Sequence, residues 1–336
     1  MSETIGVLGG GSWGTAISSI LGDNGYDVLL WTRDGAVAHG IDTTHRNPHY
    51  LPEALLAPGV QAVTDLSRLG RECRVIFPVV PSDALRPVMR GLAPHLDADQ
   101  TLIHGIKGIE PTTFKRMSQI LLAETRITKI GVLSGPNLAK EVALKQPSAA
   151  VVASTLDEVV QTGRRLLSCR SFRVYGSRDL VGVEVAGAVK NVLAIASGLA
   201  QGLGFGMNTM ALLVTRGLAE IARLGIVLGA SRETFQGLAG VGDLMVTCFS
   251  PLSRNYQVGF RLARGETLEQ IQGALGQVAE GVKTTRTVRA LAQGLGVYMP
   301  ITAGVHRVLF DAAAPATVLD ELLGLARNVY ELDEPH

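Results

Sequence analysis

Short apolar runs alternate with amphipathic segments along the first half of the chain. The runs predict strands at residues 4–8, 27–31, 74–80, 101–106, 129–133 and 148–153. Apolar positions at helical spacing between them predict helices at residues 12–21, 83–92, 112–124, 136–144 and 156–167. Because helical crossovers join parallel strands and cover both faces of a sheet, this half is predicted to be an α/β Rossmann-type, doubly wound domain over residues 1–180.

The pattern changes after about Asp179, because strand signals become few and helical spacing dominates. Helices are predicted at residues 181–200, 207–228, 256–264, 268–273, 284–295 and 303–310. We therefore expect a mainly α-helical C-terminal domain over residues 181–336. Since no Pro- or Ser-rich linker separates the halves, we expect them to share an interface and a cleft instead of being tethered flexibly.

The balance of charges limits the partners of this chain. Its 336 residues include 31 Lys plus Arg and 30 Asp plus Glu, so no excess of positive charge indicates nucleic acid or an anionic membrane. Residues 4–22 carry no charge, but their glycines and hydroxyls are poor lipid-facing material, and no basic segment precedes them. We therefore expect neither nucleic-acid binding nor stable membrane insertion.

Cysteine and histidine positions bear on metals and on compartment. The three cysteines lie far apart without a CxxC pair, which excludes a disulfide framework and a zinc ribbon and predicts a reducing, cytoplasmic setting. His39, His45 and His49 lie in a stretch that reads as a loop, without matching carboxylates or thiols. We expect these histidines to face solvent and the protein to hold no metal.

A glycine-rich turn follows the first predicted strand. Gly9, Gly11 and Gly14 match GxGxxG at the strand-to-helix turn where a dinucleotide-binding fingerprint must lie. Gly9 allows the tight turn, Gly11 lets the backbone approach the pyrophosphate, and Gly14 lets the helix pack on the strand. The helix N-terminus then offers free N–H groups to the anion. A plain turn in a Gly-rich chain is the alternative, but the strand–turn–helix context favours a dinucleotide.

The residues after the second strand bear on the choice between NADP and NAD. The sequence there reads Trp31-Thr32-Arg33-Asp34. Arg33 is suited to a 2′-phosphate through charge-assisted hydrogen bonds, whereas Asp34 keeps NAD open because a carboxylate binds the ribose 2′-hydroxyl. A solvent-exposed Arg33 without a ligand is the structural alternative. We favour NADPH.

Polar residues that interrupt apolar structure are the substrate candidates of the first half. Lys107 ends a largely apolar run, so its ammonium is expected to project from a strand end toward the cleft. Gly135 and Asn137 lie between a strand and a helix, where Pro136 suits a first helical turn and N–H groups are free for a ligand oxygen. A surface lysine and plain helix capping are the structural alternatives.

The second half offers further candidates. Lys190 and Asn191 interrupt a largely apolar helix, and a lysine whose pKa is lowered by burial can exchange a proton with a hydroxyl or carbonyl. Asp243 follows a glycine-rich turn, and Ser253-Arg254-Asn255 offers a hydroxyl, a guanidinium and an amide that suit a phosphate. The alternatives are an exposed lysine on a helix edge, a helix cap at Ser253 and a surface ion pair between Asp243 and Arg254.

Eight segments carry a specific combined pattern. They are GGGSWGTA (9–16), NPHYLP (47–52), KGIE (107–110), SGPNLAKE (134–141), VKNVLAIASG (189–198), TRGLAEIARLG (215–225), TFQGLAGVGDLMVTC (234–248) and SRNYQVG (253–259). In this order they resemble the bacterial NAD(P)-dependent glycerol-3-phosphate dehydrogenase family. The resemblance extends from Ile5 to the end of the helical half.

The resemblance implies a Rossmann domain followed by an α-helical substrate domain. It also implies a small-molecule substrate and a reaction, the reversible reduction of dihydroxyacetone phosphate to sn-glycerol 3-phosphate. The product would supply glycerophospholipid synthesis, and Lys190 would be the proton donor and acceptor. The implied substrate contacts are Lys107, Gly135, Asn137, Lys190, Asp243, Ser253, Arg254 and Asn255. The implied contacts to NADP or NAD, beside the fingerprint glycines, are Ser12, Trp13, Arg33, Lys107, Ala139, Arg254, Val278 and Glu280. A homodimer is compatible with the family.

Some positions depart from the commonest family pattern. Ile106 stands where a small hydroxylated residue often precedes the lysine, Asn137 stands where Thr is frequent, and residues 77–80 are bulky. Two other functions stay open: a β-hydroxyacid or 6-phosphogluconate dehydrogenase with the same two-domain plan, and a nucleotide-sensing regulator without chemistry. The first would need a carboxylate clamp, for which no extra basic cluster is evident near the fingerprint. The complete polar set that includes Lys190 argues against the second.

Overall fold

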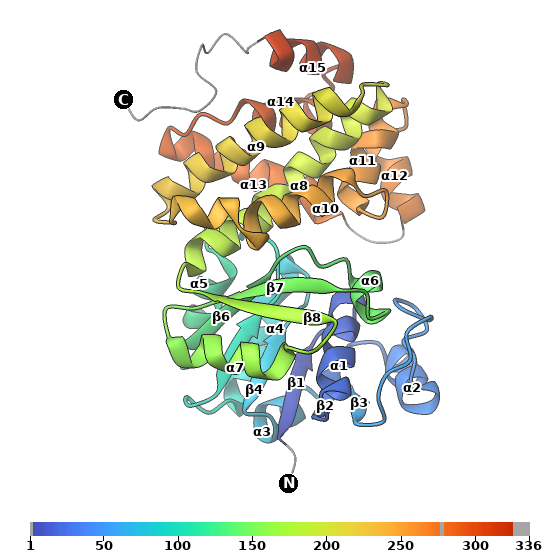
Figure 1. The fold of residues 1–336 in the computed structure, drawn as a ribbon, viewed down its shortest axis with the longest axis vertical. Coiled ribbons are helices and arrows are strands. Elements are labelled where there is room, and N and C mark those ends of the chain that lie inside the picture. The colour runs from blue at the N-terminus through green and yellow to red at the C-terminus, as the bar shows by residue number, and fades with distance from the viewer. Residues whose placement is uncertain (1–2, 276–278, 325–336) are drawn as a thin grey trace. The chain divides into compact units, whose positions relative to one another are not determined.

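The computed structural model describes residues 3–275 and 279–324 of the chain. Contacts divide the chain into two compact units, the first formed by residues 1–107 and 115–180 and the second by residues 108–114 and 181–336. In Figure 1 the first unit runs from blue to green, and the helices of the second unit run from yellow-green to red. The short segment 108–114 thus belongs with the helical second unit, although it lies within the first half of the sequence.

An eight-stranded sheet forms the centre of the first unit, in the order β3-β2-β1-β4-β5-β6-β7-β8. Its strands are β1 (Thr4–Leu8), β2 (Asp27–Trp31), β3 (Val60–Val63), β4 (Val75–Pro78), β5 (Thr101–His104), β6 (Lys129–Ser134), β7 (Ser148–Ala153) and β8 (Phe172–Ser177). Neighbours are parallel except β6 and β7. Leu8 pairs with both Trp31 and Pro78, so the carboxyl ends of three central strands lie at one edge.

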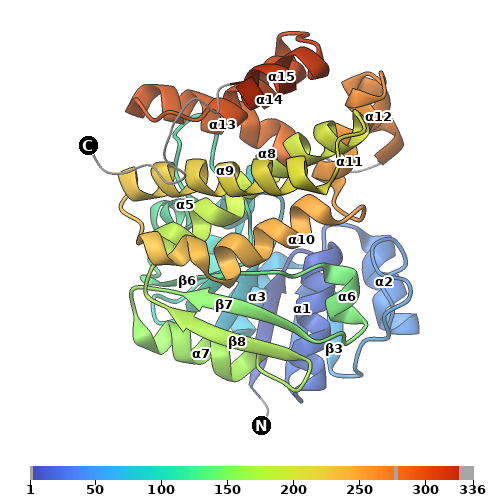
Figure 2. The same cartoon turned by 45° about the horizontal axis from the view of Figure 1, so that its top comes forward.

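Helices cover both faces of this sheet (Figures 1 and 2). They are α1 (Ser12–Asp23), α2 (Gly35–Thr44), α3 (Leu66–Glu72), α4 (Leu85–Leu92), α5 (Met117–Glu124), α6 (Ala139–Ala143) and α7 (Asp157–Leu167), with short 3₁₀ turns at Ser82–Ala84 and Ala93–His95. Val28 and Leu30 of β2 pack in one core with α1 and α7, whereas Leu29 packs in another with α3 and α4. This alternation along one strand buries both faces and confirms the predicted doubly wound α/β fold.

The second unit is helical, with its own core. It contains α8 (Leu180–Gly202), α9 (Met207–Val227), α10 (Asp243–Phe249), α11 (Arg254–Ala263), α12 (Leu268–Leu275), α13 (Glu280–Leu295), α14 (Pro300–Phe310) and α15 (Pro315–Gly324), and short 3₁₀ and π turns at Arg232–Gln236 and Leu238–Gly242. Among the described residues, only α8 is long and apolar enough to cross a membrane, and 89% of its apolar window is buried within the protein. It is therefore the core helix of this unit.

Glycines let α8 and α11 approach closely. A Cβ on Gly198 would lie 2.0 Å from the Tyr256 carbonyl oxygen, and a Cβ on Gly259 would lie 2.0 Å from that of Ile195. Neither position tolerates a side chain, because real Cβ contacts are not that short. The close approach brings the N-terminal turn of α11 next to the middle of α8, where the candidate polar residues lie.

Several elements differ from the sequence-based expectation. The strands β3 and β8 were not expected, because β3 has only four residues at a sheet edge and β8 carries exposed Arg173 and Tyr175. The helices α2, α3, α10 and α15 were also not expected. His39 therefore lies at an exposed position of α2 instead of in a loop. The helix expected from residue 112 begins at Met117, because Phe114 has a left-handed φ of 54°.

Candidate active site

The glycine fingerprint forms the turn from β1 into α1. Gly9 has φ 135°, a conformation that favours glycine, and a Cβ there would lie 3.0 Å from the Val79 backbone. A Cβ on Gly14 would lie 1.8 Å from the Gly9 carbonyl oxygen, so the helix and the turn pack together only without a side chain. By contrast, a Cβ on Gly11 would meet no atom within 4 Å. The protein thus leaves open space at the one fingerprint glycine that is expected to approach a ligand.

The N-terminus of α1 is suited to an anion. Gly11 is its N-cap and makes no side-chain capping bond, and the first turn has no acidic residue. The first N–H groups of a helix lack intrahelical partners and lie at the positive end of the helix dipole. Ser12 and Trp13 occupy this first turn, and the Trp13 indole lies against Gly105, two residues before Lys107. The structure therefore brings the fingerprint and the Lys107 segment together.

Arg33 and Asp34 lie just beyond the carboxyl end of β2, and their side chains differ in exposure and in hydrogen bonding. The Arg33 side chain is exposed. The Asp34 carboxylate accepts hydrogen bonds from the N–H groups of Ala36 at 2.8 Å and Val37 at 3.4 Å, so it caps α2. Asp34 thus already has a structural role, as N-cap residues of this type commonly do.

Gly135 and Asn137 follow the carboxyl end of β6. Gly135 has φ 143°, and a Cβ there would lie 3.0 Å from the Ala149 carbonyl oxygen. Both polar atoms of the Asn137 side chain are buried without a hydrogen-bond partner among the described residues. An unsatisfied buried amide is costly unless a ligand or water completes it. The helix expected from Pro136 begins at Ala139 instead, which places Asn137 before the N-cap of α6.

The helical unit holds a buried polar cluster of Lys190, Asp243 and Thr247. The Lys190 Nζ on α8 donates hydrogen bonds to Asp243 Oδ1 and, at 2.6 Å, to Thr247 Oγ1 on α10. The Thr247 hydroxyl donates in turn to the Asp243 carbonyl oxygen at 2.6 Å. The three residues are only 5%, 1% and 6% exposed. An ammonium held by a carboxylate in this way is able to donate a proton inside an apolar helix core.

Thr247 is a residue that the sequence reasoning missed. Its signal is its spacing, since it lies four residues after Asp243 on one face of α10. The expectation that Asp243 could lie at the surface is wrong, because Asp243 is buried and binds Lys190. The expected burial of Lys190 is observed, so it does not lie on an exposed helix edge.

The segment 253–255 begins α11, and its side chains differ in their contacts. The Ser253 hydroxyl accepts a hydrogen bond from the Tyr256 N–H at 3.3 Å and so caps the helix. The buried Asn255 Oδ1 accepts one from the Gly281 N–H at 2.9 Å, which ties α11 to the start of α13. Arg254 is exposed beside them.

The remaining candidates lie near this junction. Gly281 also packs against the Asn191 carbonyl oxygen of α8, and Glu280, the first residue of α13, is half-buried. Val278 lies outside the described residues.

Two other buried groups lie in the helical unit. Burial raises the pKa of the Cys248 thiol to about 12, so this cysteine is unreactive at neutral pH. Burial also raises the pKa of Glu220 on α9 to about 7, although the N–H groups of Ile301 and Thr302 donate to its carboxylate. Glu220 thus caps α14 from another helix, which is a structural role.

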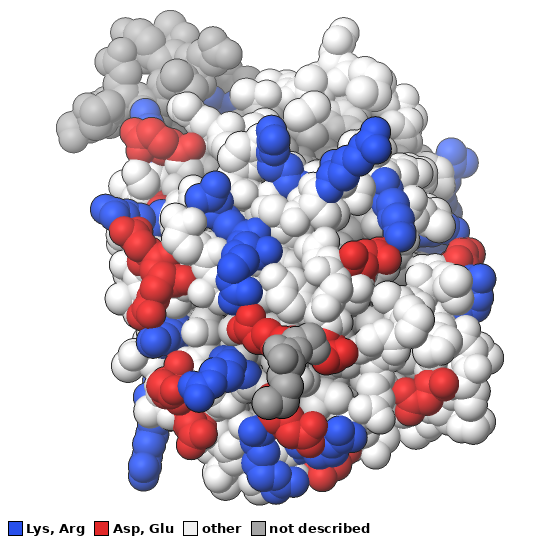
Figure 3. Space-filling model, turned by 60° about the horizontal axis from the view of Figure 1, so that its bottom comes forward, with Lys and Arg blue, Asp and Glu red and all other residues white. Residues whose placement is uncertain are grey.

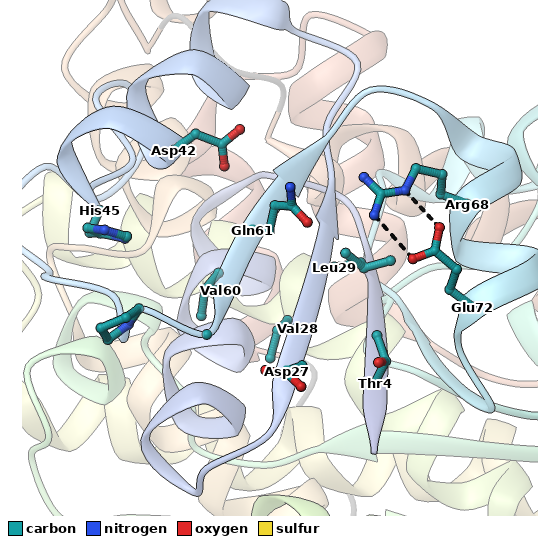
Figure 4. A pocket seen from close by; sticks show the side chains of 12 residues that line it. Thr4, Asp27, Val28, Leu29, Asp42, His45, Val60, Gln61, Arg68 and Glu72 are labelled. Atoms are coloured by element: carbon teal, nitrogen blue, oxygen red, sulfur yellow. Dashed lines mark hydrogen bonds and ion pairs between the residues drawn. The ribbon is translucent and has the colours of Figure 1, made fainter. Parts of the chain in front are cut away.

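A cavity of about 640 Å³ lies at the amino ends of β1, β2 and β3 (Figure 4). The charged side chains around it bond within the unit, as Arg68 does with Glu72 at 2.8 and 3.1 Å and Asp42 does with the Ala62 N–H at 2.8 Å. Ligands of parallel α/β sheets bind at the carboxyl ends instead. On the face drawn in Figure 3, acidic and basic side chains lie beside one another. The candidate site is therefore the sheet edge that carries the glycine fingerprint, and neither this cavity nor this charged face.

A doubly wound sheet with a glycine fingerprint, followed by a helical unit with a buried lysine–carboxylate pair, defines the class of dinucleotide-binding oxidoreductases. The chain belongs to the NAD-dependent glycerol-3-phosphate dehydrogenase family, whose N-terminal model matches residues 4–160 and whose C-terminal model matches residues 179–320. This confirms the family indicated by the sequence motifs.

Individual relatives agree with this membership. The chain is 49% identical over 321 residues to a glycerol-3-phosphate dehydrogenase [NAD(P)+] of Azotobacter vinelandii, which covers 96% of this chain and 94% of that protein. It is similar to the crystal structure of a glycerol-3-phosphate dehydrogenase from Coxiella burnetii, with a TM-score of 0.93, 38% identity, and coverage of 96% and 99%. A yeast glycerol-3-phosphate dehydrogenase structure is 27% identical, with a TM-score of 0.83 and coverage of 95% and 99%.

Proposed function

We propose that this chain catalyses the reversible NAD(P)H-dependent reduction of dihydroxyacetone phosphate to sn-glycerol 3-phosphate. Family membership supports the reaction class, and relatives at 49% identity carry the name of this activity. The observation that carries the mechanism is the buried Lys190, whose ammonium is held by Asp243 and Thr247. We assign dinucleotide binding to residues 1–180 and substrate binding to residues 181–336.

The first unit fits the dinucleotide. The open space at Gly11, the free N–H groups of the α1 N-terminus and the neighbouring Ser12 and Trp13 suit its pyrophosphate and ribose. Further cofactor contacts are proposed at Gly9, Gly14, Arg33, Lys107, Ala139, Arg254, Val278 and Glu280. Arg33 is exposed while Asp34 caps α2, which supports NADPH over NADH.

Lys190 supplies the proton of the reaction. When bound, the reduced nicotinamide supplies a hydride to the carbonyl carbon of the substrate. The Lys190 ammonium donates its proton to the oxygen of that carbonyl as negative charge develops, and Lys190 is left neutral. Asp243 keeps the ammonium charged and oriented before the transfer, and the reverse reaction returns the proton from the hydroxyl to Lys190.

The remaining polar residues hold the substrate. We assign its contacts to Lys107, Gly135, Asn137, Asp243, Ser253, Arg254 and Asn255. The orphaned amide of Asn137 supports this assignment in the first unit, because a substrate oxygen or hydroxyl would satisfy it. Binding the remote phosphate fixes the orientation of the carbonyl, so binding energy lowers the barrier to hydride transfer.

We also propose a cytoplasmic enzyme that supplies sn-glycerol 3-phosphate for glycerophospholipid synthesis; a homodimer is compatible with this proposal. The free cysteines and the mostly buried α8 support the location.

The substrate assignment is tested by product analysis. Purified protein with NADPH is given dihydroxyacetone phosphate, and in parallel a panel of 3-hydroxy acids and 6-phosphogluconate is supplied with NADP. We expect sn-glycerol 3-phosphate in amounts equal to the NADPH consumed and no turnover of the hydroxy acids. Turnover of a hydroxy acid alone would overturn the proposal, and cofactor binding without any turnover would favour a nucleotide sensor.

A further inference from the structure

The segment 45–56, which we call the closing loop, leads from α2 toward β3 and lies against the glycine fingerprint. Its ends are joined by a hydrogen bond from the Leu56 N–H to the His45 carbonyl oxygen at 2.8 Å. The Arg46 guanidinium donates to the carbonyl oxygens of Pro52 at 3.0 Å and Glu53 at 2.8 Å. These internal bonds hold the closing loop in one conformation.

Asn47 connects the closing loop to the fingerprint. Its side chain is fully buried, and its Nδ2 donates to the Gly10 carbonyl oxygen at 2.9 Å and to Thr15 Oγ1 at 2.8 Å. Its Oδ1 accepts from the N–H groups of His49 at 3.2 Å and Tyr50 at 3.1 Å. Both donors and both acceptor sites of the amide are thus used within the protein. Asn47 therefore has no capacity left for a ligand, and any role it has acts through the residues it holds.

The bond to Gly10 determines where a neighbouring N–H points. In a trans peptide the carbonyl and the following N–H point in opposite directions, so a Gly10 carbonyl held by Asn47 directs the Gly11 N–H to the other side. A glycine peptide rotates more freely than others, so without this bond the N–H would sample several directions.

Thr15 extends the same constraint by one residue. Its hydroxyl accepts from Asn47 and donates to the Gly11 carbonyl oxygen at 2.9 Å. The Gly11 carbonyl oxygen also accepts the helical hydrogen bond from the Thr15 N–H at 2.9 Å. Together these two bonds direct the Ser12 N–H, so the buried amide supports two consecutive donors at the N-terminus of α1.

We propose that Asn47 is a positioning residue that preorganises the Gly11 and Ser12 N–H groups for the cofactor pyrophosphate. This rests on the proposed assignment of the fingerprint to the dinucleotide. Donors held in place before binding lose little freedom when the anion arrives, which increases affinity without a new contact. The closing loop, which is not part of the GxGxxG pattern, is then a component of the cofactor site.

Two substitutions separate the orientation of the Gly10 peptide from the hydrogen bonds that hold the closing loop at His49 and Tyr50. Asn47→Ala removes all four hydrogen bonds, whereas Asn47→Asp keeps the acceptor for His49 and Tyr50 but cannot donate to Gly10. Gln100→Ala is the matched control, because this amide is also buried and bonds the carbonyl oxygens of Gly70 and Cys73, at the amino end of β5. Thr15→Val is a nearly isosteric variant that tests the relay if the Asn47 variants do not fold.

Binding of two ligands is measured by titration calorimetry: NADPH, and adenosine 2′-monophosphate, which lacks the pyrophosphate. Both Asn47 variants should weaken NADPH binding roughly 10- to 100-fold and Thr15→Val roughly 3- to 10-fold, as expected for one or two lost hydrogen bonds. Adenosine 2′-monophosphate affinity should change less than about 3-fold. In turnover, the cofactor KM should rise while kcat at saturating NADPH stays within about 3-fold.

The outcomes distinguish this inference from the proposed function. A wild type that binds no dinucleotide would overturn the cofactor assignment itself. A wild type that binds NADPH, with Asn47→Asp and Thr15→Val binding it equally well, would overturn only the role of Asn47. Equal losses for both ligands, or the same loss in Gln100→Ala, would show that the amide is merely structural.

Discussion

Lys190 and Asp243 form an ion pair that is almost fully removed from solvent, at 5% and 1% exposure, between two helices of one unit. Removing one partner of such a pair leaves an uncompensated buried charge. The neighbouring Thr247 hydroxyl accepts a further hydrogen bond from the ammonium at 2.6 Å. The lysine ammonium is therefore held in its charged form within the apolar core. Its role can be tested separately from cofactor binding.

Asp243→Asn keeps the size of the side chain but removes its negative charge. Without the carboxylate the charged form of Lys190 is less favoured, so the alkaline limb of the pH profile for carbonyl reduction should move to lower pH. We expect kcat at neutral pH to fall at least about 10-fold, with the NADPH dissociation constant unchanged. An unshifted pH profile with normal kcat would show that Asp243 does not control the proton on Lys190.

Glu220→Gln should change how stability depends on pH. The pKa of Glu220 is 4.5 in a model compound and about 7 in the folded protein, so the native state binds the extra proton between these values. This contribution is fully present below about pH 4.5 and is lost as pH rises through about 7, a total of about 3 kcal/mol.

Urea unfolding of both proteins between pH 4.5 and 8 measures this effect. The unfolding free energy of the wild type should fall relative to Glu220→Gln as pH rises. If the unfolding free energies of the two proteins change with pH in parallel, the pKa of Glu220 is not raised by folding. If the wild type gains stability with pH relative to the variant, folding lowers this pKa instead.

Gly11→Ala should weaken cofactor binding, whereas Gly14→Ala should lower the stability of the fold. At Gly11 a methyl group meets no protein atom and the φ of −78° suits alanine, so stability should change by less than about 1 kcal/mol while cofactor affinity falls at least about 10-fold. At Gly14 the methyl group would collide with the Gly9 carbonyl oxygen, so the thermal midpoint itself should fall. Thermal unfolding and NADPH titration measure both quantities, and a destabilised Gly11→Ala would contradict the open space.

Arg33→Ala tests the choice of cofactor. Loss of the guanidinium should lower the ratio of NADPH to NADH affinity about 10-fold or more, because only the 2′-phosphate loses a charged partner. Asp34→Ala is the adjacent control, since it removes the cap of α2 and should lower stability by about 1 kcal/mol with the ratio unchanged. The Arg33 assignment is wrong if Arg33→Ala leaves the ratio as it is in the wild type.

The features predicted from the sequence are those with strong local signals. The strands β1, β2 and β7 were predicted residue for residue because short continuous apolar runs mark strands in the interior of a sheet. The strand β3 was not, because its four residues VQAV pair only on one side, with β2, and gain their order from that pairing.

The candidate site shows the same division. Lys190 was singled out because a charge inside an apolar helix is unusual, whereas its contact with Thr247 depends on how α8 and α10 pack. Asn47 lies in a recognised motif, but its bond to Gly10 spans 37 residues and is invisible without the fold. Long-range hydrogen bonds of this kind have no periodicity or spacing that could reveal them.

If Lys190 supplies the proton while other residues bind the cofactor, single-turnover kinetics of Lys190→Ala will separate the two roles. The oxidation of NADPH is followed by absorbance after mixing with dihydroxyacetone phosphate, beside the wild type and a surface control, Lys145→Ala, whose lysine pairs with Asp23. We expect Lys190→Ala to lose about 10²- to 10⁴-fold in rate with an unchanged NADPH dissociation constant, and Lys145→Ala to lose nothing. A folded Lys190→Ala protein that turns over within a few-fold of the wild type would show that Lys190 does not supply the proton.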